Sequence, residues 1–301
     1  MNATQKISRF FHRHLHRSWA SGIVICGWIC CFAGTGGCGG VDPVENGLAT
    51  FPVNRAMLLD PRDAGLDYEV HSFRTDHDEV LEGWFIPATN ARATILINLG
   101  SVTNRSIDQQ FNRIFHDLGC NVFVYDYRGF GANYAQGSLE TIVPDARAAL
   151  DFLVTEKPAD CANLIVFGYS LGTVPTLALA AENPDVIDGI ILHGSFLADE
   201  LPYWSLMLTG VLPERWQTGA PFPRSADPLT YIERVAQPKL FLHASQDIIA
   251  PVAGAQHLFA LASEPKEFVA LPNGHAYDRN MEPRYSDALA AFILPLAADP
   301  R

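Results

Sequence analysis

Asn163-Leu164-Ile165-Val166-Phe167-Gly168-Tyr169-Ser170-Leu171-Gly172 is the segment that most clearly indicates the fold. Its apolar run is typical of a strand buried on both faces, and a helical pattern follows it. Between the two, Gly168, Ser170 and Gly172 form G-x-S-x-G, a tight turn that holds a serine hydroxyl above the strand's carboxyl end. A side chain at either glycine would clash with neighbouring backbone. The alternative is a structural Gly-Ser-Gly turn without chemistry.

The rest of the chain alternates strands and helices around this unit, which predicts βαβ units and a mostly parallel sheet flanked by helices, of the α/β class. The first two strands, joined by a hairpin, should lie antiparallel at one edge. We expect one domain over residues 55–297. The predicted strands are 68–73, 80–86, 93–99, 121–126, 163–168, 187–192, 239–243 and 267–271, and the main helices are 106–118, 139–155, 252–262 and 285–294.

A stretch rich in Leu, Trp, Tyr and Pro interrupts this alternation at residues 196–235. We interpret it as a lid of about these bounds over the strand ends. The alternative is a connecting helix pair that packs on the core.

The charge of the chain argues against a nucleic-acid partner. The formal net charge is −12, and the four basic residues of the first 38 positions are accompanied by no acid. The remainder therefore carries about −16, which repels phosphate backbones.

Residues 1–38 have the order of an export signal, with basic residues from Lys6 to Arg17, an apolar run from Trp19 to about Ala33, and then small residues. The run is short for a membrane span, which needs about 20 apolar residues. An uncleaved anchoring helix is the alternative. Residues 39–54 are expected to be a linker.

Cys38 lies in Thr35-Gly36-Gly37-Cys38-Gly39-Gly40, which resembles a bacterial lipoprotein cleavage box, although Thr35 stands where leucine is usual. It is therefore a lipidation candidate. This predicts a protein of the cell envelope, anchored by lipid or by the uncleaved helix. An ordinary signal peptide, with a periplasmic or secreted protein, is the alternative. Of the six cysteines, Cys120 and Cys161 remain in the body of the chain, and we expect both to be free.

A serine nucleophile needs a base, and the base needs an acid that orients it. Asp247 and His275 each follow a predicted strand, at the edge of the sheet where such sites form. They follow Ser170 in the order acid, then histidine, which is the chain order of catalytic triads whose serine lies on a G-x-S-x-G turn. Asp278 and His243 are the alternative acid and base.

Several motifs now support a resemblance. Asp126-Tyr127-Arg128-Gly129-Phe130-Gly131 is similar to a D-Y-R-G-x-G loop, Pro238 to Pro251 resembles P-x-L-x-x-H-G-x-x-D-x-x-x-P with Ala244 in place of glycine, and Asn273-Gly274-His275 resembles a G-H loop. Residues 66–297 resemble the α/β-hydrolase superfamily, in the branch of bacterial esterases and depalmitoylating hydrolase-domain proteins. The resemblance implies an α/β-hydrolase fold.

The resemblance also implies an oxyanion hole of two backbone N–H groups, from Ser101 and from Leu171 after the nucleophile. Leu99 stands where the family usually carries histidine, which leaves the geometry of this loop open. Because the donor is a backbone N–H, Ser101 could still supply it.

These features predict a serine hydrolase that cleaves carboxylic esters, thioesters included, with Ser170, His275 and Asp247 as a catalytic triad. A small-molecule acyl ester is the expected partner, and no cofactor or metal is expected because no zinc, nucleotide or haem motif occurs. The alternatives are a serine peptidase, an acyltransferase on the same fold, and a non-catalytic envelope lipoprotein that serves as a binding scaffold.

Overall fold

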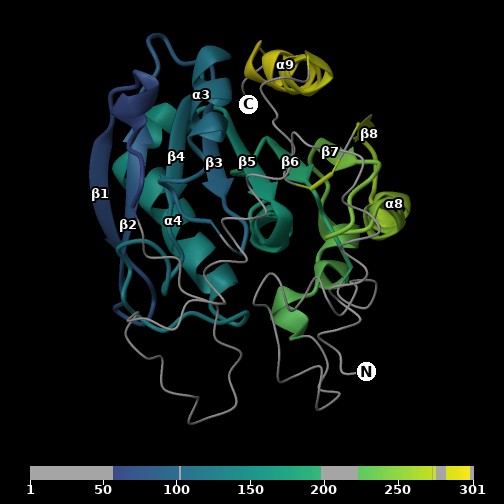
Figure 1. The fold of residues 1–301 in the computed structure, drawn as a ribbon, viewed down its shortest axis with the longest axis horizontal. Coiled ribbons are helices and arrows are strands. Elements are labelled where there is room, and N and C mark those ends of the chain that lie inside the picture. Colours follow the sequence, from purple (N-terminus) through teal and green to yellow (C-terminus); the bar gives the residue numbers. More distant parts are fainter. Residues whose placement is uncertain (1–56, 102, 198–222, 273, 276–282, 299–301) are drawn as a thin grey trace, which may run out of the picture. The chain divides into compact units, whose positions relative to one another are not determined.

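The computed structural model describes residues 57–101, 103–197, 223–272, 274–275 and 283–298. In these parts of the chain, eight strands form one sheet in the order β1-β2-β4-β3-β5-β6-β7-β8 (Figure 1). The strands are β1 (Glu69–Arg74), β2 (Val80–Ile86), β3 (Thr94–Asn98), β4 (Asn121–Tyr125), β5 (Leu164–Tyr169), β6 (Gly189–His193), β7 (Lys239–Ala244) and β8 (Lys266–Leu271).

The sheet is mostly parallel, as predicted. β1 pairs antiparallel with β2, and β2 pairs antiparallel with β4, whereas the pairs from β4 through β3 to β8 are parallel. The hairpin between β1 and β2 turns through Asp78, whose φ of 64° lies in the left-handed region that Asp tolerates in turns. β5, which carries the serine turn at its end, lies between β3 and β6 near the middle of the sheet.

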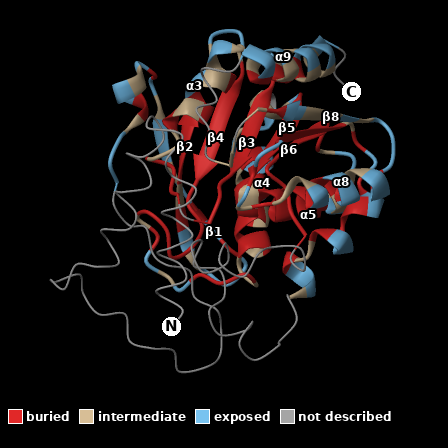
Figure 2. Cartoon of the chain, turned by 45° about the vertical axis from the view of Figure 1, so that its right-hand side comes forward, coloured by how far each residue is buried: buried red, intermediate tan, exposed pale blue. Residues whose placement is uncertain are grey.

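Helices cover both faces of the sheet. α3 and α9 lie at one face and α4, α5 and α8 at the other (Figure 2). The helices are α3 (Gln109–Asp117), α4 (Ile142–Glu156), α5 (Thr173–Glu182), α8 (Val252–Leu261) and α9 (Pro283–Ala298), with 3₁₀ turns at η2 (Pro61–Ala64), η3 (Pro158–Cys161), η4 (Ser170–Gly172), η6 (Arg224–Ala226), η7 (Pro228–Thr230) and η8 (Ile232–Arg234).

Two helices begin three residues later than the sequence suggested, in each case because a polar side chain binds nearby backbone. Asn104 Oδ1 accepts the Ser106 N–H at 2.9 Å, so a turn precedes α3. Thr141 Oγ1 accepts the Ser138 N–H at 2.9 Å and donates to the Ser138 carbonyl at 2.9 Å, so a second turn precedes α4. Short polar side chains commonly compete with helix formation in this way.

The central strands are buried on both faces because their side chains alternate between two hydrophobic cores (Figure 2). In β3, Leu96 points to the core beneath α4 and α5, while Ile95 and Ile97 point to the core beneath α3 and α9. All three are fully buried, and burying such a side chain stabilises the fold by about 1.5–3 kcal/mol.

The described part of the predicted lid packs into the core. Phe196 and Leu197 are buried after β6, and Ile232 and Val235 are fully buried with the side chains of α4 and α5. Residues 198–222, which make up most of the predicted lid, lie outside the described residues.

The leader of residues 1–38 with Cys38, and the linker of residues 39–54, also lie outside the described residues, so export and lipidation stay predictions. Within the described chain, no helix is long and apolar enough to cross a membrane. Cys120 and Cys161 are both free, as expected. Cys161 is the last residue of η3.

Candidate active site

Ser170 lies in a strained turn between β5 and α5. Its φ is 52°, in the left-handed region that few residues other than glycine adopt. Such strain persists only where the surroundings enforce it, and it is concentrated at functional sites. The predicted need for glycines is confirmed. A Cβ at Gly168 would lie 2.5 Å from the Gly172 carbonyl oxygen, and one at Gly172 would overlap the carbonyl of Asn98.

A chain of buried hydrogen bonds holds this turn against the neighbouring strands. The Tyr125 hydroxyl donates to Asn98 Oδ1 at 2.7 Å, and Asn98 Nδ2 donates to Thr176 Oγ1 at 2.9 Å. Thr176 Oγ1 in turn donates to the Gly172 carbonyl at 2.9 Å. Because each member is buried and partnered, the network fixes α5 and the turn relative to β3 and β4.

Asp247 lies in the turn after β7, and both of its carboxylate oxygens are engaged. Oδ1 accepts the backbone N–H groups of Ile249 at 2.9 Å and Ala250 at 2.8 Å. Oδ2 lies 2.6 Å from His275 Nδ1. The side chain of Asp247 is only 1% exposed. The two backbone donors therefore fix which oxygen faces His275.

His275, which follows β8, connects the other two residues. Its Nε2 lies 3.0 Å from Ser170 Oγ while its Nδ1 faces Asp247. Gly194 lies close beside the imidazole, because a Cβ there would be 3.1 Å from His275 Cε1. The structure thus places the three residues singled out in the sequence within hydrogen-bond reach of one another, in the order Ser170, His275, Asp247.

The alternative base, His243, takes a different place. It is fully buried in β7, its Nε2 is 2.9 Å from the Ala250 carbonyl oxygen, and the same atom is 3.7 Å from Asp247 Oδ2. Burial lowers the pKa of His243, so the imidazole stays neutral near pH 7. The alternative acid, Asp278, lies outside the described residues.

The loop after β3 approaches the nucleophile closely. A Cβ at Gly100 would lie 3.5 Å from Ser170 Cβ, which shows how near the backbone passes. Ser101 follows Gly100 and is buried, and Leu171, directly after Ser170, is buried as well. The side chain of Leu99, which replaces the usual histidine, is buried in the core beneath α3 and α9. Its carbonyl accepts a hydrogen bond from the Tyr127 hydroxyl at 3.2 Å.

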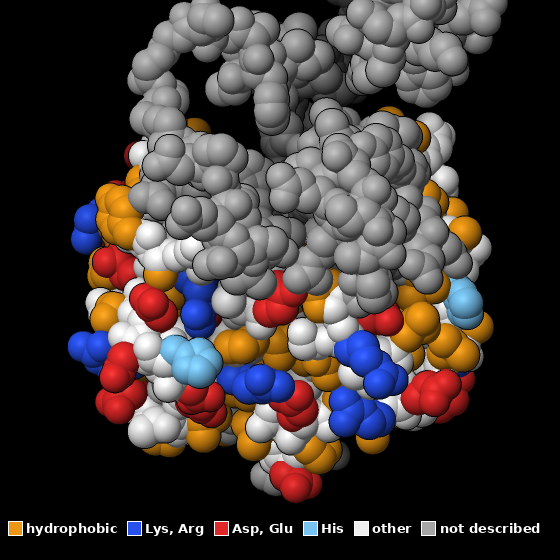
Figure 3. All heavy atoms as spheres, turned by 90° about the horizontal axis from the view of Figure 1, so that it is seen from below, with side chains coloured by type: hydrophobic (Ala, Val, Ile, Leu, Met, Phe, Trp, Pro, Cys, Tyr) orange, Lys and Arg blue, Asp and Glu red, His pale blue; other side chains and the backbone are white. Residues whose placement is uncertain are grey.

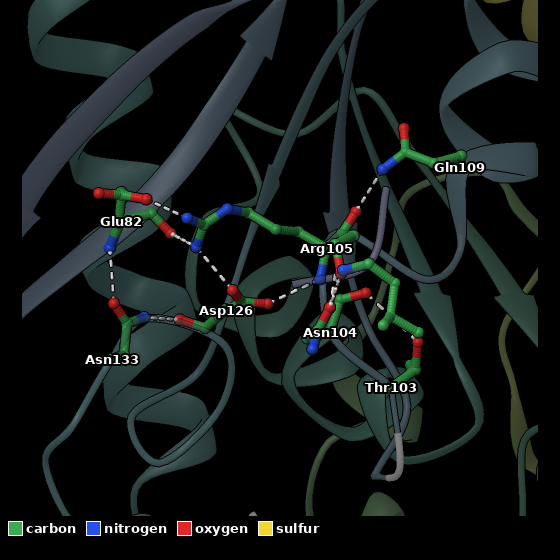
Figure 4. Close-up of polar contacts among 9 residues, drawn as sticks. Glu82, Thr103, Asn104, Arg105, Gln109, Asp126 and Asn133 are labelled. Carbon is green, nitrogen blue, oxygen red and sulfur yellow. Dashed lines mark hydrogen bonds and ion pairs between the residues drawn. The ribbon is translucent and has the colours of Figure 1, made fainter. Parts of the chain in front are cut away.

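A buried arginine holds the far end of this loop (Figure 4). The backbone N–H of Arg105 donates to Asp126 Oδ1 at 2.7 Å, and its guanidinium donates to Asp126 Oδ2 at 2.6 Å. The same guanidinium pairs with the Glu82 carboxylate and lies over the Trp84 ring, with Cζ 4.9 Å from the ring centroid. The side-chain amide of Asn133 also donates a hydrogen bond, from Nδ2 to the Asp126 backbone carbonyl at 2.5 Å. One side chain thereby ties the loop to β2 and β4.

The D-Y-R-G-F-G segment after β4 is explained by two such buried pairs. Besides Asp126, Arg128 donates to Asp145 of α4, from Nε at 2.8 Å and from a terminal nitrogen at 2.5 Å. Gly131 is required because a Cβ there would overlap the Asp126 carboxylate. This motif therefore has a structural role, because its charged residues are paired within the fold.

Sequence reasoning missed the contribution of Arg105, Asn98 and Gly194, which occur outside any recognisable motif. Arg105 is preceded by Asn104 and followed by a helical pattern, and neither feature indicates a buried pairing with a residue 21 positions later. No group of three or more His, Cys, Asp or Glu side chains suited to a metal ion occurs among the described residues.

Comparisons with known proteins agree with this fold. A family model described as "Serine aminopeptidase, S33" matches residues 89–226. The α/β-hydrolase domain-containing protein WAV2 of Arabidopsis thaliana is 30% identical over 258 residues, covering 78% of this chain and 79% of the relative. The chain belongs to the α/β-hydrolase superfamily. An uncharacterised protein of Mycobacterium tuberculosis is 28% identical to this hydrolase over 263 residues, covering 85% and 84% of the two chains.

Solved structures share the fold of this hydrolase. The esterase Pf2001 of Pyrococcus furiosus superposes with a TM-score of 0.68 at 16% identity, covering 84% of the hydrolase and 100% of that chain. Est1E of Butyrivibrio proteoclasticus, solved with ferulic acid bound, superposes with a TM-score of 0.62 at 15% identity, covering 76% and 100%. At these identities the likeness establishes the fold.

Proposed function

We propose that this hydrolase cleaves carboxylic esters, thioesters included, through a Ser170–His275–Asp247 triad and an acyl-enzyme. One observation carries the proposal: Ser170 Oγ lies 3.0 Å from His275 Nε2, while Nδ1 of the same imidazole lies 2.6 Å from Asp247 Oδ2. A nucleophile within reach of a base, which is itself oriented by an acid, is the arrangement that nucleophilic acyl transfer requires. The strained turn at Ser170 adds to it, because backbone strain of this kind is concentrated at functional sites.

The reaction follows from these contacts. His275 Nε2 takes the Ser170 hydroxyl proton as Oγ attacks the acyl carbonyl, and Asp247 stabilises the imidazolium that forms. The backbone N–H groups of Ser101 and Leu171 are the proposed donors to the oxyanion, each contributing roughly 3–4 kcal/mol. His275 then passes the proton to the leaving alcohol or thiol. Water, deprotonated by the same nitrogen, releases the acyl group and restores Ser170.

The shared fold favours an ester over other substrates, because it is the fold of the esterase Pf2001 and of Est1E, which was solved with ferulic acid bound. Figure 3 shows acidic, basic and apolar side chains interspersed on the described part of one face of the molecule. The description of the matching family model favours a second candidate, a serine aminopeptidase, which would use the same three residues on an amide bond.

A labelling experiment tests the proposal. The purified chain should react with a fluorophosphonate probe and hydrolyse p-nitrophenyl esters, and Ser170→Ala should abolish both because the nucleophilic oxygen is removed. Ser225→Ala, at an exposed serine in η6, is the matched control and should keep both. Persistent labelling of Ser170→Ala would refute the assignment of the nucleophile. Turnover of aminoacyl amides in preference to every ester would favour the peptidase.

A further inference from the structure

Tyr169, the residue between Gly168 and Ser170, contacts the segments around the triad but has no role in the reaction steps described above. It ends β5, and its side chain leaves the sheet on the same face as that of Phe167, two positions earlier. Its ring packs in the core beneath α3 and α9, with ring centroids 5.4 Å from Phe111 and 5.1 Å from His193. The residue is 7% exposed, so this ring is held on several sides.

The tyrosine hydroxyl reaches the loop that carries the base. It donates a hydrogen bond to the backbone carbonyl oxygen of His275 at 3.0 Å. The Tyr169 ring also lies beside the imidazole of His275, with centroids 5.4 Å apart and planes inclined by 30°. One side chain therefore contacts both the main chain and the ring of the residue that faces Ser170.

The same ring borders the loop after β3. A Cβ at Gly100 would lie 3.2 Å from Tyr169 Cδ1, so the loop that leads to Ser101 rests against the ring. Tyr169 is thus wedged between the two segments that must be placed correctly relative to Ser170. Because it is covalently adjacent to Ser170, its position follows that of the nucleophile.

We propose that Tyr169 is a positioning residue that holds His275 at the distance from Ser170 required for proton transfer. This inference rests on the proposed function and adds a residue to it. Asp247 orients the imidazole from its far side through Nδ1, but that bond alone leaves the backbone of His275 free to shift. The hydroxyl of Tyr169 anchors that backbone to the nucleophile's own strand. Misplacement of a reacting group by about 1 Å lowers rates by about 100-fold.

Tyr169→Phe tests this, because it removes the hydroxyl and keeps the ring packed. We expect kcat for a soluble p-nitrophenyl ester to fall about 10- to 100-fold, with KM changed less than twofold and the labelling rate reduced in parallel. The matched control is Tyr285→Phe. The Tyr285 hydroxyl lies in the same aromatic cluster, 3.3 Å from His193 Nδ1, and belongs to α9. The control should keep kcat within about twofold.

A purely structural role of Tyr169 gives a different pattern, in which both variants lose thermal stability and activity to the same degree. Unchanged kcat in Tyr169→Phe, or an equal fall in Tyr285→Phe, would overturn the inference.

A spectroscopic measurement separates this inference from the proposed function. The proton on His275 Nδ1, bonded to Asp247, should give a low-field NMR resonance that disappears in His275→Gln. In Tyr169→Phe we expect its exchange with water to accelerate at least tenfold, because the loop is released. If the wild type neither turns over esters nor reacts with the probe, the proposed function fails, yet the resonance still reports whether Tyr169 positions His275. An exchange rate that is unchanged in Tyr169→Phe would overturn the positioning role of Tyr169.

Discussion

Asp247→Asn is the most informative perturbation of this site, because the structure dictates how the new amide must lie. Oδ1 of Asp247 accepts two backbone N–H groups, from Ile249 at 2.9 Å and Ala250 at 2.8 Å. In the variant, the amide oxygen has to remain there, since an NH₂ group would face two donors. The NH₂ group is therefore forced toward His275 Nδ1, the atom that Asp247 Oδ2 now faces at 2.6 Å.

The consequence is an imidazole in the wrong tautomer. To accept from the new NH₂ group, His275 Nδ1 must lose its proton, so Nε2 carries the proton and donates it to Ser170 Oγ. A base in that form cannot take the serine proton. An acid-to-amide exchange in such a triad lowers kcat by about 10⁴-fold, which corresponds to about 5 kcal/mol of transition-state stabilisation. Stability should change little, because the two backbone hydrogen bonds are kept.

The assay is kcat and KM on a soluble p-nitrophenyl ester, together with the thermal unfolding midpoint. Asp227→Asn is the matched control. Asp227 accepts the Leu229 N–H at 3.0 Å in the same manner, but it caps η7. The control should keep kcat within about twofold. A folded Asp247→Asn variant that retains more than about a tenth of wild-type kcat would contradict this prediction, since the acid would then not control the tautomer of His275.

Two predictions concern stability. Gly172→Ala should destabilise the fold by at least about 2 kcal/mol in urea unfolding, because its Cβ would overlap the Asn98 carbonyl and lie 2.7 Å from the Leu99 carbonyl oxygen. Gly274→Ala, whose Cβ would lie in ordinary contact 3.7 Å from the Gln246 carbonyl oxygen, should change the midpoint little, and equal midpoints of the two variants would contradict the clash. Burial raises the pKa of Asp126 to about 6, against the opposing effect of Arg105, so the folded chain retains this proton at pH values where the unfolded chain has released it. The stability that this proton contributes is complete below about pH 4 and is lost as the pH rises to about 6. The free energy of unfolding of Asp126→Asn minus that of the wild type should therefore rise by about 3 kcal/mol between these pH values. A difference that stays flat or falls would contradict the raised pKa of Asp126.

The strand and helix pattern was predictable because it depends on local periodicity. Runs such as that at β3 could be assigned to a doubly covered sheet from their composition, and the hairpin of β1 and β2 followed from its turn residues. The first residues of α3 and α4 were less predictable. The turns that precede these helices depend on hydrogen bonds of the Asn104 and Thr141 side chains and not on the periodicity of hydrophobic residues.

The serine turn and the order of Ser170, Asp247 and His275 could be predicted from the sequence, because a tight strand-to-helix turn imposes glycines locally and each partner follows a strand. The assembled sheet was needed to show that His275 rather than His243 faces Ser170, since that depends on where β7 and β8 end relative to β5. It also decided the contact between the Tyr169 hydroxyl and the His275 carbonyl. These residues are 106 positions apart, and no local pattern encodes a hydrogen bond that forms only when the sheet is assembled.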